Sequence, residues 1–125
     1  MSGVKKFEEL ECWKEARTLV KMVYELTLNP EFRKDFGLKD QIQRTSVSVM
    51  TNIAEGFARF SIKEFIRFLD YTQSSSEEVK SLLYVAFDLG YIDKQELEKT
   101  YQKASDVRNM TLSLIKYLRK SERAQ

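Results

Sequence analysis

The residues between Leu38 and Arg67 follow the pattern of a helix that is apolar over most of its circumference. Successive residues of an α-helix are about 100° apart, and a helix that packs on one core needs an apolar stripe only a little wider than that angle. In this segment the apolar and small residues fill an arc of roughly 200° by the same spacing, and they are Ile42, Ser46, Val47, Val49, Met50, Ile53, Ala54, Gly56, Phe57 and Phe60. The part of the apolar arc that exceeds the width of one packing stripe predicts burial against other helices of the same bundle or against another subunit.

Composition favours long helices and excludes several kinds of catalytic site. The 125 residues include only 4 Gly and 1 Pro, which leaves little room for the turns of an all-β fold. The chain has no His, so His-based acid–base catalysis, His-containing nucleophile systems and His-containing metal motifs are excluded. Cys12 is the only cysteine, and its place on an apolar helix face predicts a core residue. We therefore expect no enzymatic activity, no catalytic metal and no cofactor; Mg²⁺ sites made of carboxylates alone stay open as an alternative.

We expect no segment that would direct the chain to or through a membrane. The first residues lack the apolar region of a signal peptide. The longest apolar run, Leu82 to Phe87, is far shorter than the roughly 18 residues of a membrane span. A lone thiol fits a reducing compartment, so we expect a cytoplasmic protein without membrane contact.

Helix-breaking residues divide the first half of the chain into two long helices. The first is expected at about residues 7–28, because Pro30 cannot continue it. Pro30 could open a short helical turn, with Gly37 closing it. The second helix is expected from about Lys39 to Arg59.

Capping residues place two more helices in the second half. Ser61 and Glu64 have the spacing of a capping box that begins the third helix, and Gly90 is suited to end it. Asp93 and Glu96 have the same spacing at the start of the fourth helix. Short connections make neighbouring helices antiparallel, so we predict an all-α fold, an antiparallel up-down-up-down four-helix bundle. We expect residues 1–125 to form a single domain, with flexible ends at about residues 1–6 and 121–125.

Helical spacing also predicts the core-facing residues. In the first helix they are Cys12, Ala16, Leu19, Val23 and Leu26. In the third they are Phe65, Leu69, Thr72, Ser76, Val79, Leu83 and Ala86, with a wider face formed by Phe68, Tyr71, Ser75, Leu82 and Leu89. In the fourth they are Leu97, Tyr101, Ala104, Val107, Thr111, Leu114 and Leu118. The run Ser74 to Ser76 is either a flexible linker or a place where helices approach closely, and continued periodicity favours the close approach.

Residues 41–59 resemble a known sequence pattern. They read QIQRTSVSVMTNIAEGFAR, which is similar to the pattern QIRRAAVSIPxNIAEGFGR of the 23S rRNA intervening-sequence proteins, small bacterial four-helix bundles. Residues 65–69, residues 88–92 and the stretch from Leu10 to Ala16 also resemble segments of that family. Met50 stands where the family usually has Pro, so we expect a less kinked helix. Gln43 replaces a common Arg, which weakens any basic surface there, and Ala58 replaces a common Gly.

The resemblance implies an assembly protein of unspecified role. It implies that the bundles assemble into pentameric rings, and that members are encoded within intervening sequences of rRNA genes or elsewhere in bacterial genomes. Related bundles are accessory subunits of diversity-generating retroelements that bind a reverse transcriptase and nucleic acid. The expected partners are therefore other copies of this chain, together with RNA, DNA or a nucleic-acid enzyme.

The polar stripe of the second helix is one candidate site. It comprises Arg44, Asn52, Glu55, Gly56 and Arg59. An acid–base site would pair Glu55 with a nearby Arg. The structural interpretation, which we favour, has Glu55 paired across a helix or subunit boundary and Asn52 satisfying a neighbouring backbone group.

A second candidate is the basic end of the fourth helix. Five cations between positions 108 and 123 are opposed only by Glu122, and they are Arg108, Lys116, Arg119, Lys120 and Arg123. They could contact phosphates, or they could simply be solvated and oppose the negative end of the helix dipole. Lys63 and Arg67 form a weaker group of the same kind.

Four aromatic residues near the turn between the second and third helices form a third candidate. Phe57, Phe60, Phe65 and Phe68 could stack on bases, but their places on the apolar arcs favour core or interface packing. Together these features predict a non-catalytic, oligomeric accessory or scaffold module that binds RNA, DNA or a nucleic-acid enzyme. The alternative is a structural protein–protein adaptor without nucleic-acid binding.

Overall fold

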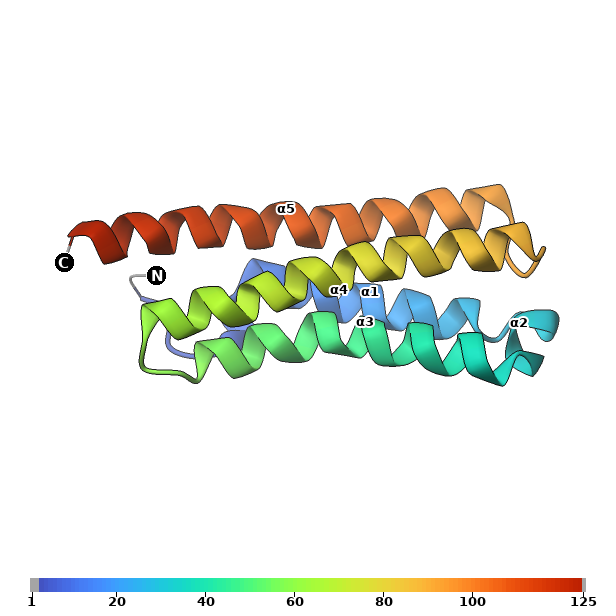
Figure 1. Ribbon diagram of the computed structural model, residues 1–125, viewed down its shortest axis with the longest axis horizontal. Helices are drawn as coiled ribbons and strands as arrows, with labels where there is room; N and C mark the ends of the chain where they lie inside the picture. The colour runs from blue at the N-terminus through green and yellow to red at the C-terminus, as the bar shows by residue number, and fades with distance from the viewer. Residues whose placement is uncertain (1–2, 125) are drawn as a thin grey trace.

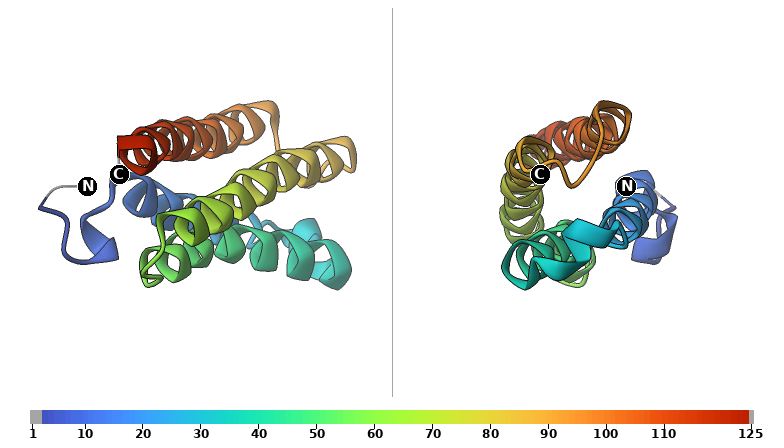
Figure 2. Two further views of the ribbon diagram at one scale, coloured as in Figure 1. Left: turned by 60° about the vertical axis from the view of Figure 1, so that its left-hand side comes forward. Right: turned by 90° about the vertical axis from the view of Figure 1, so that its right-hand side faces the viewer.

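The computed structural model describes residues 3–124 as an antiparallel bundle of four long helices (Figure 1). The elements in chain order are η1 (Phe7–Glu9), α1 (Glu11–Leu26), α2 (Pro30–Lys34), α3 (Phe36–Phe57), α4 (Ile62–Asp88) and α5 (Lys94–Ala124). Helix α3 packs against α1 and α4, and α5 packs against α4 and α1, so each long helix has two long neighbours around a shared core (Figure 2). The all-α, up-down-up-down four-helix fold expected from the sequence is confirmed.

The core contains most of the residues that helical spacing selects. All the core positions expected in α1 and all seven expected in the central stripe of α4 are buried. In α5 the expected Tyr101 and Leu114 are only half-buried, whereas Ile115, which was not expected, is fully buried. Tyr71 and Leu89 were expected to widen the buried face of α4 and are instead exposed. Leu89 lies beyond the last residue of the helix.

Two of the expected helix boundaries in the first half are wrong. The first helix does not begin at residue 7, because Leu10 adopts an extended conformation between η1 and α1. Helix α3 begins at Phe36, where the Asp35 side chain caps it by accepting a hydrogen bond of 3.1 Å from the Leu38 amide. Gly37 therefore lies in the first turn of α3 and does not close the short helix that begins at Pro30.

The caps at the end of α4 and the start of α5 agree more closely with the sequence prediction. Asp93 and Glu96 form both halves of a capping box, with hydrogen bonds of 2.9 and 2.7 Å. Gly90 has a positive φ of 77°, and the following Tyr91 amide donates to the Ala86 carbonyl at 2.9 Å, the bonding pattern of a Schellman motif. Tyr91 also donates from its hydroxyl to Asp35 at 2.9 Å, which joins the α4–α5 connection to the start of α3.

Small residues line the interface between α3 and α4. The hydroxyl groups of Ser48 and Ser75 are 3.1 Å apart, and Thr72 donates to the Val49 carbonyl at 3.0 Å. The serine run from Ser74 to Ser76 is helical and is therefore not a flexible linker. The contact between Ser48 and Ser75 confirms the alternative, a close approach of two helices. We call this interface the small-residue seam; it comprises Thr45, Ser48, Val49, Asn52 and Gly56 of α3 with Thr72 and Ser75 of α4.

The broad apolar arc of α3 is largely covered by the chain's own helices. Ile42, Val49 and Ile53 are fully buried, and most other members of the arc are half-buried. The segment from Leu38 to Arg67 is not one helix, because residues 58–61 form the turn between α3 and α4. Phe60 lies in that turn, and its expected place on the apolar arc is therefore wrong.

The ends of the described chain are structured where they meet the bundle. Val4 packs against the core, and α5 continues through residues 121–124. The flexibility expected for residues 1, 2 and 125 lies outside the described residues. Between residues 3 and 124, none of the helices combines the length and the apolar character needed to cross a bilayer.

Candidate functional site

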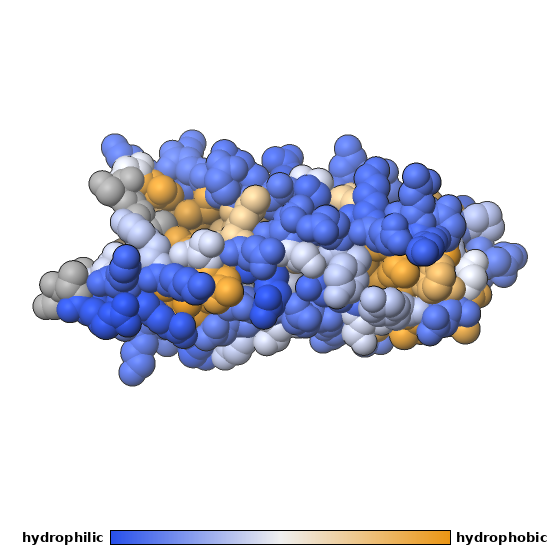
Figure 3. Space-filling view, turned by 90° about the horizontal axis from the view of Figure 1, so that it is seen from above, coloured by the Kyte–Doolittle hydropathy of each residue, from blue (hydrophilic) through white to orange (hydrophobic). Residues whose placement is uncertain are grey.

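Four cations project from the last turns of α5 and have no acidic partner among the described residues. Lys116, Arg119, Lys120 and Arg123 are exposed, and no ion pair within residues 3–124 involves any of them. We call these four residues the basic end of α5. Figure 3 views the molecule from the α5 side and shows strongly hydrophilic side chains over this end of the helix, with hydrophobic surface showing between them. Glu122 is the only acidic residue among these turns.

Arg108 does not belong to this group of unpaired cations. Its Nε lies 3.1 Å from Glu77 Oε1 on α4, and the same oxygen is 3.0 Å from Lys80 Nζ. The charge of Arg108 is therefore committed to the contact between α4 and α5.

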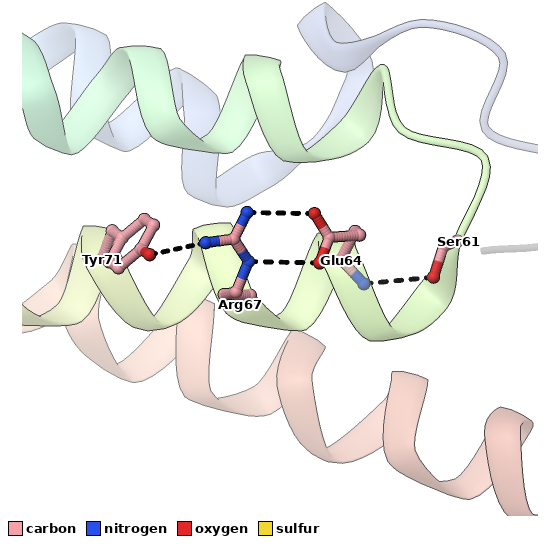
Figure 4. Close-up of polar contacts among 4 residues, drawn as sticks. All are labelled: Ser61, Glu64, Arg67 and Tyr71. Atoms are coloured by element: carbon pink, nitrogen blue, oxygen red, sulfur yellow. Dashed lines mark hydrogen bonds and ion pairs between the residues drawn. The ribbon is translucent and has the colours of Figure 1, made fainter.

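Lys63 and Arg67 lie on the first turns of α4, at the same end of the bundle as the basic end of α5 (Figure 1). Arg67 is occupied by neighbours on its own helix. It donates to the Glu64 carboxylate at 3.1 and 3.0 Å and to the Tyr71 hydroxyl at 2.8 Å (Figure 4). These hydrogen bonds lower the pKa of Glu64 and raise the pKa of Arg67. Lys63 is exposed, and no ion pair in the described part of the chain includes it.

The polar stripe of α3 does not gather into an acid–base site. Arg44 pairs with Asp40 at 3.1 Å on the solvent side. Asn52 donates to the Ser48 carbonyl at 2.8 Å and to the Ser48 hydroxyl at 2.9 Å, which is the backbone contact that the structural interpretation expects. Glu55 is exposed and forms no ion pair among residues 3–124, so the pairing across a helix boundary that was expected for it is not found there.

Gly56 and Arg59 instead organise the turn between α3 and α4. A Cβ on Gly56 would lie 2.7 Å from Phe68 Cβ and 3.0 Å from a ring carbon of Phe65, so only glycine fits. The Arg59 guanidinium lies over the Phe68 ring, 4.8 Å from its centroid, and the Arg67 guanidinium is 5.2 Å from the same centroid. Two cations thus cover the aromatic ring of Phe68, the residue whose Cβ lies beside Gly56.

The four phenylalanines near this turn have different environments. Phe65 and Phe68 are 5% and 7% exposed, and the half-buried Phe57 packs edge-on against Phe65 with ring centroids 5.9 Å apart. Phe60 is fully exposed, at 109% of its reference area. Packing therefore explains three of the four residues and leaves Phe60 without a role in the core.

An open groove of about 310 Å³ lies between this turn and the last turns of α5. Its lining includes Phe57, Phe60, Phe65, Tyr117, Leu118 and Ser121. Tyr117 was not selected as a candidate from the sequence. The sequence feature that could have identified Tyr117 is its position between Lys116 and Lys120, outside the stripe of core residues on α5.

The described residues offer no metal centre and no reactive thiol. Within residues 3–124, no three Asp, Glu or Cys side chains gather closely enough to hold a metal ion. Burial raises the pKa of the Cys12 thiol to about 11. At neutral pH the thiol is therefore protonated, as expected for a core residue.

A solved structure shares this fold. It is the crystal structure of a protein with unknown function from the S23 ribosomal protein family from Bacteroides thetaiotaomicron. The match has a TM-score of 0.77 at 21% sequence identity and covers 84% of this chain and 98% of that chain. At this identity the match shows the fold alone. None of the curated proteins compared with this chain matches it.

The sequence itself matches a family over most of its length. The matched region spans residues 8–113 and so includes the α3 segment from Asn52 to Gly56, the small-residue seam and the Schellman motif after α4. Because more than half of the chain is matched, this protein belongs to the 23S rRNA-intervening sequence protein family.

Proposed function

We propose that this protein is a non-catalytic, self-associating scaffold that binds RNA or DNA, or an enzyme acting on them, through the basic end of α5. The observation that carries the proposal is the set of four exposed cations without ion-pair partners among residues 3–124. These four cations lie on successive turns of one helix end and concentrate positive charge there, whereas Arg108 is engaged with Glu77 at 3.1 Å. Unengaged cations remain available for phosphate groups.

Self-association would strengthen a weak site. The chain has a net charge of only +2, so its overall field does not attract nucleic acid strongly. If several copies assemble, the basic end of α5 is repeated once in each copy. One long nucleic acid can then contact several copies, and the combined affinity exceeds that of a single contact.

The experiment is a salt titration of nucleic-acid binding with a charge-reversal variant. Labelled RNA and DNA are titrated with wild-type protein and with the variant K116E/R119E/K120E/R123E, and binding is followed by fluorescence anisotropy. Wild-type affinity should fall steeply with salt, because each phosphate contact contributes about 0.7–0.9 to the slope of log K against log salt. The variant should bind much more weakly, with a flatter slope.

A matched control separates local contact from total charge. The variant K21E/R33E/K94E/K99E changes the net charge by the same amount at exposed positions outside the basic end of α5. It should retain most of the wild-type affinity. If neither RNA nor DNA binds at low salt, or if both variants behave alike, direct binding of nucleic acid by the basic end of α5 is wrong. Binding to a protein, either a nucleic-acid enzyme or the partner of an adaptor, then becomes the better explanation.

A further inference from the structure

We propose that the groove between the α3–α4 turn and the C-terminal end of α5 binds single-stranded nucleic acid, with unpaired bases stacking on Phe60 and Tyr117. This inference rests on the proposed function and names the form of nucleic acid that the same end of the bundle selects. The first observation is Phe60, whose ring is fully exposed and adds nothing to the core.

The second observation is that Phe60 and Tyr117 line one groove although they come from different parts of the chain. Phe60 lies in the turn after α3, and Tyr117, which is 44% exposed, projects from α5. The groove holds about 310 Å³, which is at the small end of the roughly 300–1,000 Å³ typical of ligand sites. It can accept a planar group such as a base, and it is too small for a whole helix.

The third observation is the charge around these rings. Lys116 directly precedes Tyr117, Lys120 follows it by one helical turn, and Arg59 is among the residues that line the groove. A partner that fits must combine anionic groups with flat apolar surfaces. A nucleic acid strand carries a phosphate on every residue and a π-face on every base, so it meets both requirements.

The same chemistry favours single strands over duplexes. In a duplex each base already stacks between its neighbours, so its face is unavailable to an outside ring. In a single strand the faces are accessible, and aromatic side chains next to a basic surface are the usual means of holding them. The groove should therefore bind a single strand more tightly than a duplex of the same sequence.

The test uses the full chain and a labelled oligothymidylate of about 10 nucleotides, within the roughly 4–16 that one single-strand site covers. F60A should bind it about 5- to 150-fold more weakly, which corresponds to the loss of one base–aromatic stack. Because Phe60 is exposed, the substitution should leave the thermal transition and the mass in solution unchanged. Y117A should weaken binding in the same direction.

Two further variants make the result specific. F36A removes another exposed phenylalanine, 72% exposed at the start of α3, and should bind as the wild type does. F60W retains a stacking ring, so it should restore affinity. Its new indole should lose fluorescence when the oligonucleotide binds, whereas the buried Trp13 should not respond.

The outcomes separate this inference from the proposed function. If the oligonucleotide binds with strong salt dependence but F60A and F36A bind equally well, the stacking inference is overturned and the phosphate-binding proposal stands. The stacking inference would also be overturned if a duplex of the same sequence bound as tightly as the single strand. The same holds if an oligoglutamate peptide bound the protein and lost as much affinity in F60A as the oligonucleotide does. If no oligonucleotide binds at low salt, both proposals fail together.

Discussion

Gly56 on α3 faces Phe68 on α4 so closely that a Cβ at position 56 would lie 2.7 Å from the Cβ of Phe68. Real Cβ atoms do not approach so closely. The atoms that a new Cβ would meet are the Cβ of Phe68 and a ring carbon of Phe65, and neither belongs to a flexible side-chain end that could move aside. The absent side chain of Gly56 therefore allows α3 and α4 to come together at the end of the bundle that carries the candidate site.

Replacing Gly56 with Ala should destabilise the protein. Alanine favours helix over glycine by about 0.5–1 kcal/mol, but overpacking against Phe68 and Phe65 should cost about 1–3 kcal/mol. We expect a net loss of stability, measured as a lower urea midpoint with an unchanged m-value. Gly37 in the first turn of the same helix is the control, because its nearest neighbour to an added Cβ is 3.8 Å away. Gly37→Ala should leave stability unchanged or increase it.

Two fully buried threonines should respond oppositely to replacement by valine. Thr111 Oγ1 has no hydrogen-bond partner within residues 3–124, whereas Thr72 donates to the Val49 carbonyl at 3.0 Å. An unsatisfied buried polar group costs about 1–3 kcal/mol, so Thr111→Val should raise the free energy of unfolding by about 1 kcal/mol. Thr72→Val should lower it by a similar amount. Calorimetry of both variants measures the two changes in the free energy of unfolding. A loss of stability in Thr111→Val would contradict the expectation.

The hydrogen bond between Tyr91 and Asp35 should make stability sensitive to alkaline pH. The Asp35 carboxylate accepts from the Tyr91 hydroxyl and raises the pKa of Tyr91 above its usual value near 10. The stabilisation is fully present below the pKa of the unfolded chain and is lost as the pH rises through the higher pKa of the folded state. Denaturation at a series of alkaline pH values should therefore show a smaller decline for Tyr91→Phe than for the wild type. Tyr24→Phe, at an exposed tyrosine, should follow the wild-type curve.

We also predict that the protein forms a stable oligomer, and the family resemblance implies that this oligomer is a pentamer. Light scattering at micromolar concentration measures the mass directly, and the mass of a single chain with a cooperative thermal transition would contradict the prediction. Phe57→Asp should disrupt assembly or folding by burying an unpaired charge. Phe57 packs on Phe65 within the chain, so the thermal transition must be measured alongside the mass to separate the two effects.

Periodicity predicts the helices and the core because both depend on contacts that repeat every three or four residues. It identifies fully buried residues such as Leu19, Leu69 and Val107 without knowledge of the fold. It fails at Phe60, because the angular spacing of a helix no longer applies once the helix has ended at Phe57. It also fails at Asp35, whose side chain begins α3 earlier than the apolar pattern suggests.

The candidate site was less accessible to sequence reasoning because it depends on contacts between distant residues. The sequence places Arg108 beside the other cations of α5, but it cannot show that Glu77 on the preceding helix binds it. Likewise, no local pattern brings Phe60 and Tyr117 to one groove. That juxtaposition requires the antiparallel packing of α5 along α4 and the turn that ends α3.

The small-residue seam fixes how α3 and α4 can move relative to each other. Where backbones approach this closely, sliding one helix along the other would drive larger neighbouring side chains into the spaces now filled by glycine, serine and threonine. The two helices are therefore locked in register and should behave as one rigid body. We therefore expect any change in the width of the bundle to come from α1 and α5, the helices that lie outside this seam.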